Sequence, residues 1–266
     1  MIFANFTHPP QPNDGAVLPT CAQTVATAVA KFPGFAGYIL HNPDQWNSEG
    51  VMGYPYGLDG QDWKNAHAVA GNLWARIGGC KPHDLPAKDG PIDTLAKKLR
   101  PSTAVLLDYG SGQGAEADYG RFRRIFQNSA AGNSLIVAPE ANARRAWITG
   151  AANVWLTAEW FHCNDVAVPN ATNDCDDDRW SVRDWLATHP ETKFVVEITT
   201  DKRADPARKL GFCPTADCPN PCPDWSAARV EIAKAFHSID PKRVVVSVRM
   251  TGMSPAQVAA LRSLNG

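Results

Sequence analysis

Short apolar runs, rich in β-branched and aromatic residues, alternate with helical patterns along the whole chain of 266 residues. Runs that stay apolar throughout are typical of parallel strands covered by helices, because both faces of such strands are buried. Eight runs are predicted as strands if the third, which contains Gly and Pro, is counted: 2–6, 36–42, 50–56, 103–110, 134–140, 153–162, 192–201 and 243–250. Helices are predicted between and after them, at 20–32, 62–79, 118–132, 141–151, 178–190, 224–240 and 253–264. This alternation predicts an α/β protein, and specifically a single (β/α)₈ TIM barrel.

Length and charge narrow the class of protein further. No low-complexity linker divides the sequence, and about 250 residues is a common size for one barrel, so we expect one domain over residues 1–266. The formal net charge is −1, which gives no support for a nucleic-acid partner. Because no run of about 18 apolar residues occurs, no membrane partner is expected either.

Cysteine usage favours an oxidising compartment. The chain has seven cysteines, and five of them fall late, in two loop-like stretches. Cys163 with Cys175, and two of Cys213, Cys218 and Cys222, could close local disulfides, while reduced thiols are the alternative. The sequons at 5–7 and 170–172 agree with secretion. The chain opens on an apolar run and not on a signal peptide, so a secreted or extracellular protein would have a leader outside this sequence.

The segment LLDYGSGQG at 106–114 permits two interpretations. An apolar run that ends at Asp108 and continues into alternating glycines resembles the S-adenosylmethionine-binding turn of methyltransferases. Glu140, near the end of the next predicted strand, would then hold the ribose hydroxyls. Two or three strands precede this turn, however, and one helix follows the last strand, so the usual closing hairpin has no sequence to form it. The methyltransferase interpretation is therefore the alternative.

In a barrel, the same segment would form one catalytic strand end. Chemistry in (β/α)₈ enzymes sits at the carboxyl ends of the strands, and acidic residues gather at those predicted ends. A pair of carboxylates can cleave a glycosidic bond, one protonating the leaving oxygen and the other attacking or stabilising the anomeric carbon. The candidate catalytic residues are Asp108, Glu140 and Glu159. The candidate substrate-binding residues are Tyr109, Trp160, Asp44, Glu197 and Arg249. Glu197 and Arg249 could instead form an ion pair across adjacent strand ends.

The order of these segments resembles the chitinase-type barrels of glycoside hydrolase family 18. The resemblance rests on AHAVAGNLWARIGG (66–79), AVLLDYG (104–110), SLIVAPE (134–140), NVWLTAEWFHCND (153–165) and HPETKFVVEI (189–198). It implies a barrel that acts on or binds carbohydrate, without cofactor or metal. The family's catalytic glutamate position is occupied by Gly110, and its catalytic tyrosine falls at or near Glu159. The family's mechanism is therefore not carried over intact.

Two functions remain open from the sequence. The first is a glycoside hydrolase-like barrel whose carboxylates at the strand ends act on a carbohydrate polymer or glycan. The second is a barrel with the same cleft that binds the sugar without cutting it, as expected for a family 18-like chain without the glutamate.

Overall fold

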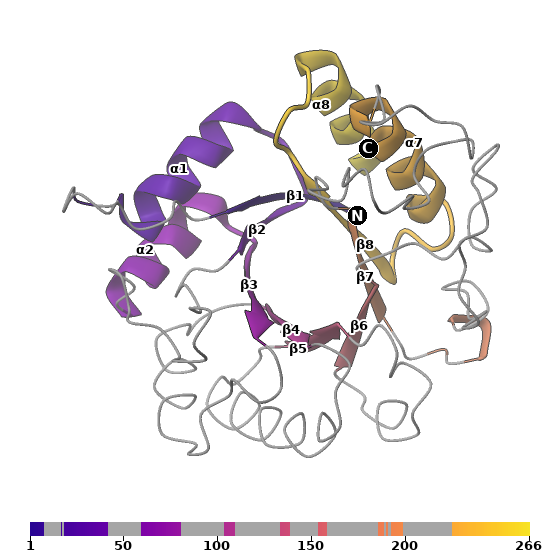
Figure 1. Cartoon of the computed structure of the whole chain (residues 1–266), viewed down its shortest axis with the longest axis horizontal. Helices are drawn as coiled ribbons and strands as arrows, with labels where there is room; N and C mark the ends of the chain where they lie inside the picture. The colour runs from indigo at the N-terminus through magenta and orange to yellow at the C-terminus, as the bar shows by residue number, and fades with distance from the viewer. Residues whose placement is uncertain are drawn as a thin grey trace, which may run out of the picture.

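Eight parallel strands pair in sequence order and close into a barrel in the computed structural model of this chain (Figure 1). The structure describes residues 1–7, 17, 19–41, 60–80, 104–109, 134–138, 154–158, 186–188, 190, 193–198 and 225–266. The strands are β1 (Ile2–Thr7), β2 (Gly37–His41), β3 (Leu73–Cys80), β4 (Ala104–Tyr109), β5 (Ser134–Ala138), β6 (Val154–Ala158), β7 (Lys193–Ile198) and β8 (Val244–Arg249). The barrel closes where β1 pairs with β8, as the register of Phe3 opposite Ser247 shows.

The helices whose bounds the structure describes lie outside this ring of strands (Figure 1). They are α1 (Cys21–Lys31), α2 (Gly60–Ala70), α7 (Trp225–His237) and α8 (Pro255–Arg262), the last continued by a short 3₁₀ turn, η2 (Ser263–Asn265). Two helices begin at complete capping boxes. Thr20 with Gln23 caps α1, and Ser254 with Gln257 caps α8, so the first N–H groups of each helix have side-chain acceptors.

Seven of the eight predicted strands overlap strands of the structure, and one prediction is wrong. The third strand of the barrel is β3, not 50–56, which lies outside the described residues. The predicted helix 62–79 is confirmed in its first half and wrong in its second: α2 ends at Ala70, and Leu73 to Cys80 are extended. Gly71 separates the two elements with φ +71°, a left-handed conformation that ends helices and favours glycine. Near the end of α2, Val69 is 44% exposed.

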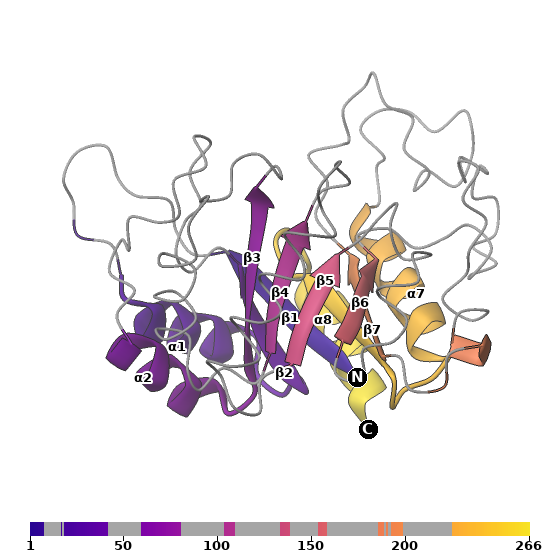
Figure 2. The same cartoon turned by 90° about the horizontal axis from the view of Figure 1, so that it is seen from below.

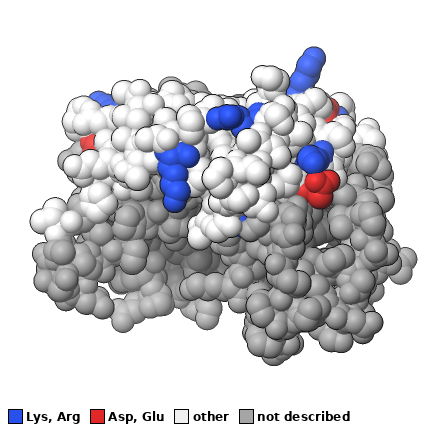
Figure 3. Space-filling model, turned by 90° about the horizontal axis from the view of Figure 1, so that it is seen from above, with Lys and Arg blue, Asp and Glu red and all other residues white. Residues whose placement is uncertain are grey.

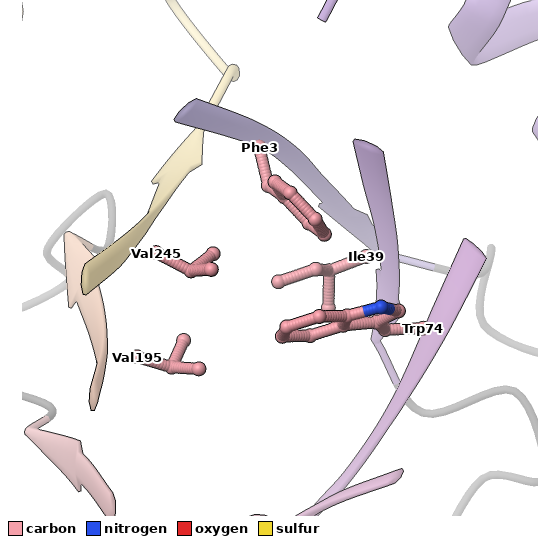
Figure 4. Packing of buried hydrophobic residues seen from close by; sticks show 5 residues of the cluster. All are labelled: Phe3, Ile39, Trp74, Val195 and Val245. Carbon is pink, nitrogen blue, oxygen red and sulfur yellow. The ribbon is translucent and has the colours of Figure 1, made fainter. Parts of the chain in front are cut away.

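Large apolar side chains fill the interior of the barrel. Phe3, Ile39, Trp74, Val195 and Val245 form one buried cluster from five strands and point toward one another (Figure 4). The rings of Phe3 and Trp74 lie 4.6 Å apart between centroids, in a tilted arrangement. Neighbouring residues on the same strands, such as Ile2 and Val246, are also fully buried. Alternate residues of a strand face opposite sides of a sheet, so the strands are apolar throughout because both faces are covered.

The chain ends meet at one end of the barrel. The side chain of Asn265 accepts from the N–H of Ile2 over 2.7 Å and donates to its carbonyl over 3.2 Å. In Figure 2 both termini lie at the lower end of the barrel, whereas the arrowheads of β3 and β4 point to the upper end. The carboxyl ends of the strands therefore open on the side opposite the termini.

The face of the molecule in Figure 3 carries few charges. It shows more Lys and Arg side chains than acidic ones, with uncharged residues covering most of the described surface. No helix among the described residues combines the length and the apolar character needed to cross a bilayer.

Candidate functional site

Four of the predicted site residues lie at the carboxyl end of the barrel. Asp108 and Tyr109 are the last two residues of β4, and Arg249 is the last residue of β8. Glu197 is the last but one residue of β7. The other four predicted residues, Asp44, Glu140, Glu159 and Trp160, lie outside the described residues.

The strand register places these four positions around the ring. Asp108 is opposite Ala138 of β5, and Tyr109 is opposite Cys80 of β3. On the other side of the barrel, Glu197 is opposite Ser247, and Arg249 is opposite Asn5. The adjacent strands β7, β8 and β1 therefore bring Glu197 and Arg249 to neighbouring backbone positions, whereas Asp108 belongs to a strand across the ring.

A buried polar pair lies just above the apolar cluster. Asn5 donates through Nδ2 to Oγ of Ser247 over 2.9 Å, and the two residues are 2% and 0% exposed. Asn5 is two residues beyond Phe3, and Ser247 is two residues beyond Val245, so both continue the interior rows of their strands. A polar group without a partner is costly in such a place, and the hydrogen bond removes much of that cost.

The interior thus changes from apolar to polar toward the carboxyl ends of the strands. In β8 the interior row runs from Val245 through Ser247 to Arg249, whose side chain is half-buried. Sequence reasoning selected Arg249 and did not select Asn5 or Ser247. The available signal was a polar residue between apolar neighbours inside each strand, Asn5 in IFANFT and Ser247 in VVVSVR.

Burial of Asn5 also corrects one sequence argument. The sequon at 5–7 would agree with secretion only if its asparagine were accessible, but Asn5 lies inside the barrel. A glycan cannot be accommodated there in the folded protein, so this sequon gives no support for a secreted chain.

The carboxyl end of β8 is held from the helix side by Arg229 of α7. Its guanidinium donates to the carbonyl of Arg249 and, over 2.9 Å, to the carbonyl of Thr251. The N–H of Met250 donates to the carbonyl of Asn5 over 3.2 Å. Burial disfavours the charged form of Arg229 and lowers its pKa to about 10.

The closed barrel overturns the methyltransferase interpretation. A nucleotide-type cofactor binds where the strand order of an open sheet reverses, because the crevice forms at that switch point. Here the order runs from β1 to β8 without reversal and closes. The segment LLDYGSGQG contributes β4 up to Tyr109, and Gly110 to Gly114 lie outside the described residues. Within the described ranges, no three His, Cys, Asp or Glu side chains come together as a metal site would require.

Comparison by sequence identifies no relative: no known family matches the chain, and no curated protein matches it. Comparison by structure finds barrels. Thermotoga maritima Cel5A in complex with cellobiose matches with a TM-score of 0.54 at 7% identity, covering 98% of this chain and 94% of that one. The same protein in complex with mannotriose gives a TM-score of 0.52 at 8% identity, over 98% and 96% of the two chains.

A second similar structure is a larger protein. The GH2 beta-galacturonidase from Eisenbergiella tayi, bound to galacturonate, matches with a TM-score of 0.57 at 13% identity. The match covers 98% of this chain and 51% of that one. At such low identities the similarity shows a shared barrel fold and not a shared family. Cel5A and the beta-galacturonidase are glycoside hydrolases, but neither places this chain in family 18.

Proposed function

We propose that this chain is a complete (β/α)₈ barrel, with a helix after every strand, whose open end binds and hydrolyses a carbohydrate polymer or glycan. The observation that carries the proposal is the change inside the barrel from the Phe3–Trp74 cluster to the polar pair Asn5–Ser247 and then to Arg249. Barrel enzymes place their chemistry at this end. Solved barrels of similar fold were obtained in complex with cellobiose, mannotriose and galacturonate, which agrees with a sugar ligand.

The proposed catalytic groups are the carboxylates of Asp108, Glu140 and Glu159. One of them protonates the leaving oxygen, and a second attacks the anomeric carbon or activates water. The separation between the two carboxylates decides the stereochemistry, since about 5 Å gives retention and about 6.5–9.5 Å gives inversion. Glu159 follows β6 directly in the sequence, in a run of aromatic residues where an ionised carboxylate is costly without a partner.

The proposed binding groups are aromatic and polar residues. Tyr109 and Trp160 offer aromatic faces on which a sugar ring can stack. Polar contacts to sugar hydroxyls would come from Asp44, Glu197 and Arg249. In a family 18-like site the usual glutamate would be replaced by Gly110, so the same cleft without turnover is the second candidate function.

The decisive experiment compares Glu159→Gln with the wild type on carboxymethylcellulose, mannan, chitin and polygalacturonate. Release of reducing ends by the wild type, lost in Glu159→Gln while the fold is kept, supports the hydrolase. Glu231→Gln is the matched control, because Glu231 is exposed on α7 and pairs with Lys234 over 2.7 Å, away from the strand ends. Binding by the wild type without product supports the binding function. Equal activity in the wild type and Glu159→Gln contradicts the role of Glu159.

We also propose secretion into an oxidising compartment, with disulfides among the late cysteines. Cys163, Cys175 and the three cysteines at 213, 218 and 222 lie outside the described residues, and Cys21 is buried at the start of α1. Mass spectrometry of peptides from unreduced protein tests the proposal directly. Recovery of all five late cysteines as thiols would contradict it.

A further inference from the structure

Arg229 is a buried cation for which the proposed chemistry has no use. It is 1% exposed and lies on α7, which packs on the outside of β7 and β8 (Figure 1). Removing a guanidinium from water is costly, so its retention in this position calls for a specific role. Its contacts indicate that role, because it donates to two carbonyls at the end of β8.

Those two carbonyls lie at the end of β8 and just beyond it. They belong to Arg249 and Thr251, just before and just after Met250. Met250 itself donates to the carbonyl of Asn5. Inside the barrel, Ser247 accepts from the side chain of Asn5. Residues 247–251 are therefore fixed from β1, from the barrel interior and from α7, with Arg249 in the middle.

We propose that Arg229 is a positioning residue that holds the backbone at Arg249, so that the Arg249 side chain keeps one orientation at the barrel mouth. The assignment of Arg249 as a sugar-binding residue rests on the proposed function, but the positioning itself does not. An arginine suits this task because its planar fork offers several N–H donors at fixed angles. It can therefore donate to two carbonyls two residues apart. The ammonium of a lysine lacks this fixed donor geometry and would hold the two carbonyls less rigidly.

Arg243 provides a matched control at the opposite end of the same strand. It immediately precedes β8 and also donates to two carbonyls, those of Leu186 over 3.1 Å and Pro190 over 2.9 Å. Its Nε donates to Asp240 over 2.8 Å. Replacing Arg243 removes the same kind of contact without touching the carboxyl end of β8. A purely structural effect would be common to Arg229 and Arg243, whereas an effect on Arg249 would be specific to Arg229.

The test is NMR of the side-chain Nε–H groups in protein labelled with ¹⁵N-arginine. The Arg249 signal is assigned by its loss in Arg249→Lys. We expect Arg229→Met to shift and broaden the Arg249 signal, and Arg229→Lys to give a smaller change, while Arg243→Met lowers Tm but leaves the signal in place. An unchanged Arg249 signal in folded Arg229→Met, or an equal change in Arg243→Met, overturns the proposal. If Arg229→Met does not fold, Arg229→Gln and Arg229→Lys decide by the same criterion.

Affinity for the four polysaccharides tests the link to function separately. For whichever of them the wild type binds, we expect Arg229→Met to weaken binding roughly tenfold to a hundredfold, the scale of a misplaced binding group, and Arg243→Met to leave it unchanged. Unaltered affinity in Arg229→Met overturns the functional part. If the wild type binds none of the four, the proposed function fails, and the Arg249 signal alone decides whether Arg229 positions that residue.

Discussion

Replacing Gly37 by alanine tests the packing of the barrel interior. Gly37 begins β2, and a Cβ added there would lie 2.5 Å from Cε2 and Cζ of the Phe3 ring and 2.9 Å from Nδ2 of Asn72. Ordinary contacts between carbon atoms are about 3.5–4.0 Å, so an overlap of about 1 Å has to be relieved. The ring has little room to retreat, because it packs against Trp74 at 4.6 Å.

Two opposing effects determine how much Gly37→Ala changes the free energy of unfolding. A glycine-to-alanine change reduces the freedom of the unfolded chain, which stabilises the fold by about 0.4–1 kcal/mol where the site accepts a methyl group. Overpacking a well-filled core costs about 1–3 kcal/mol, and here the obstacle is a ring held between strands. We therefore expect the free energy of unfolding to fall by about 1–2 kcal/mol, or a Tm lower by about 2–8 °C.

Chemical denaturation of Gly37→Ala, Phe3→Leu and the double variant tests whether the contact with the Phe3 ring causes the loss of stability. Leucine lacks the two ring atoms nearest the added methyl group, so the double variant should be more stable than additivity predicts, by about 1 kcal/mol. Gly71→Ala is the control: its φ of +71° carries a backbone cost, but no atom lies within 4 Å of the added Cβ. Its effect should add to that of Phe3→Leu. A Gly37→Ala variant as stable as the wild type, or additive with Phe3→Leu, refutes the reasoning.

Three further predictions concern polar groups. Asp62 accepts from two N–H groups in the first turn of α1, so Asp62→Ala should lower the free energy of unfolding in urea by about 0.5–2 kcal/mol, and a value near zero would contradict the capping role. Ser247→Ala removes the acceptor of Asn5 and should lower the free energy of unfolding in urea by about 1–3 kcal/mol. An unchanged free energy of unfolding would contradict a stabilising role for this hydrogen bond. Burial lowers the pKa of His67 below 6.5, so the folded chain binds fewer protons than the unfolded chain, and stability should fall as pH drops below about 6.5. His67→Gln should reduce that slope between about pH 7 and 5, and an unchanged slope would show that other groups cause it.

The sequence predicted the parallel strands because their burial on both faces leaves a direct mark. Val244 to Val246 and Ala104 to Leu107 are apolar at consecutive positions, which helices covering a sheet require. The segment 62–79 misled because Ala66, Val69, Ala70, Leu73 and Ile77 also fit a helical spacing. The turn at Gly71–Asn72 was the stronger signal, since a left-handed glycine stops a helix and allows a strand to begin two residues later.

The sequence predicted the position of the strand ends at the candidate site better than it predicted which residues interact there. Strand ends could be found from the apolar runs, which is why Asp108, Glu197 and Arg249 lie where expected. Asn5 and Ser247 were missed because a lone polar residue in an apolar strand does not reveal its partner, and their hydrogen bond joins positions 242 residues apart. Arg229 was missed for the same reason, since the contacts that matter are carbonyls of a later strand.

The division of the interior along its axis separates two kinds of tolerance to mutation. Below Asn5 and Ser247, the rings of Phe3 and Trp74 pack closely, so few other side chains would fit at these two positions. Above them, the interior row of β8 ends at the half-buried Arg249, where a substitution should cost less folding free energy than in the apolar cluster. Combinatorial libraries confined to such upper positions should therefore retain folded members at high frequency, and under the proposed function they would sample different carbohydrate preferences.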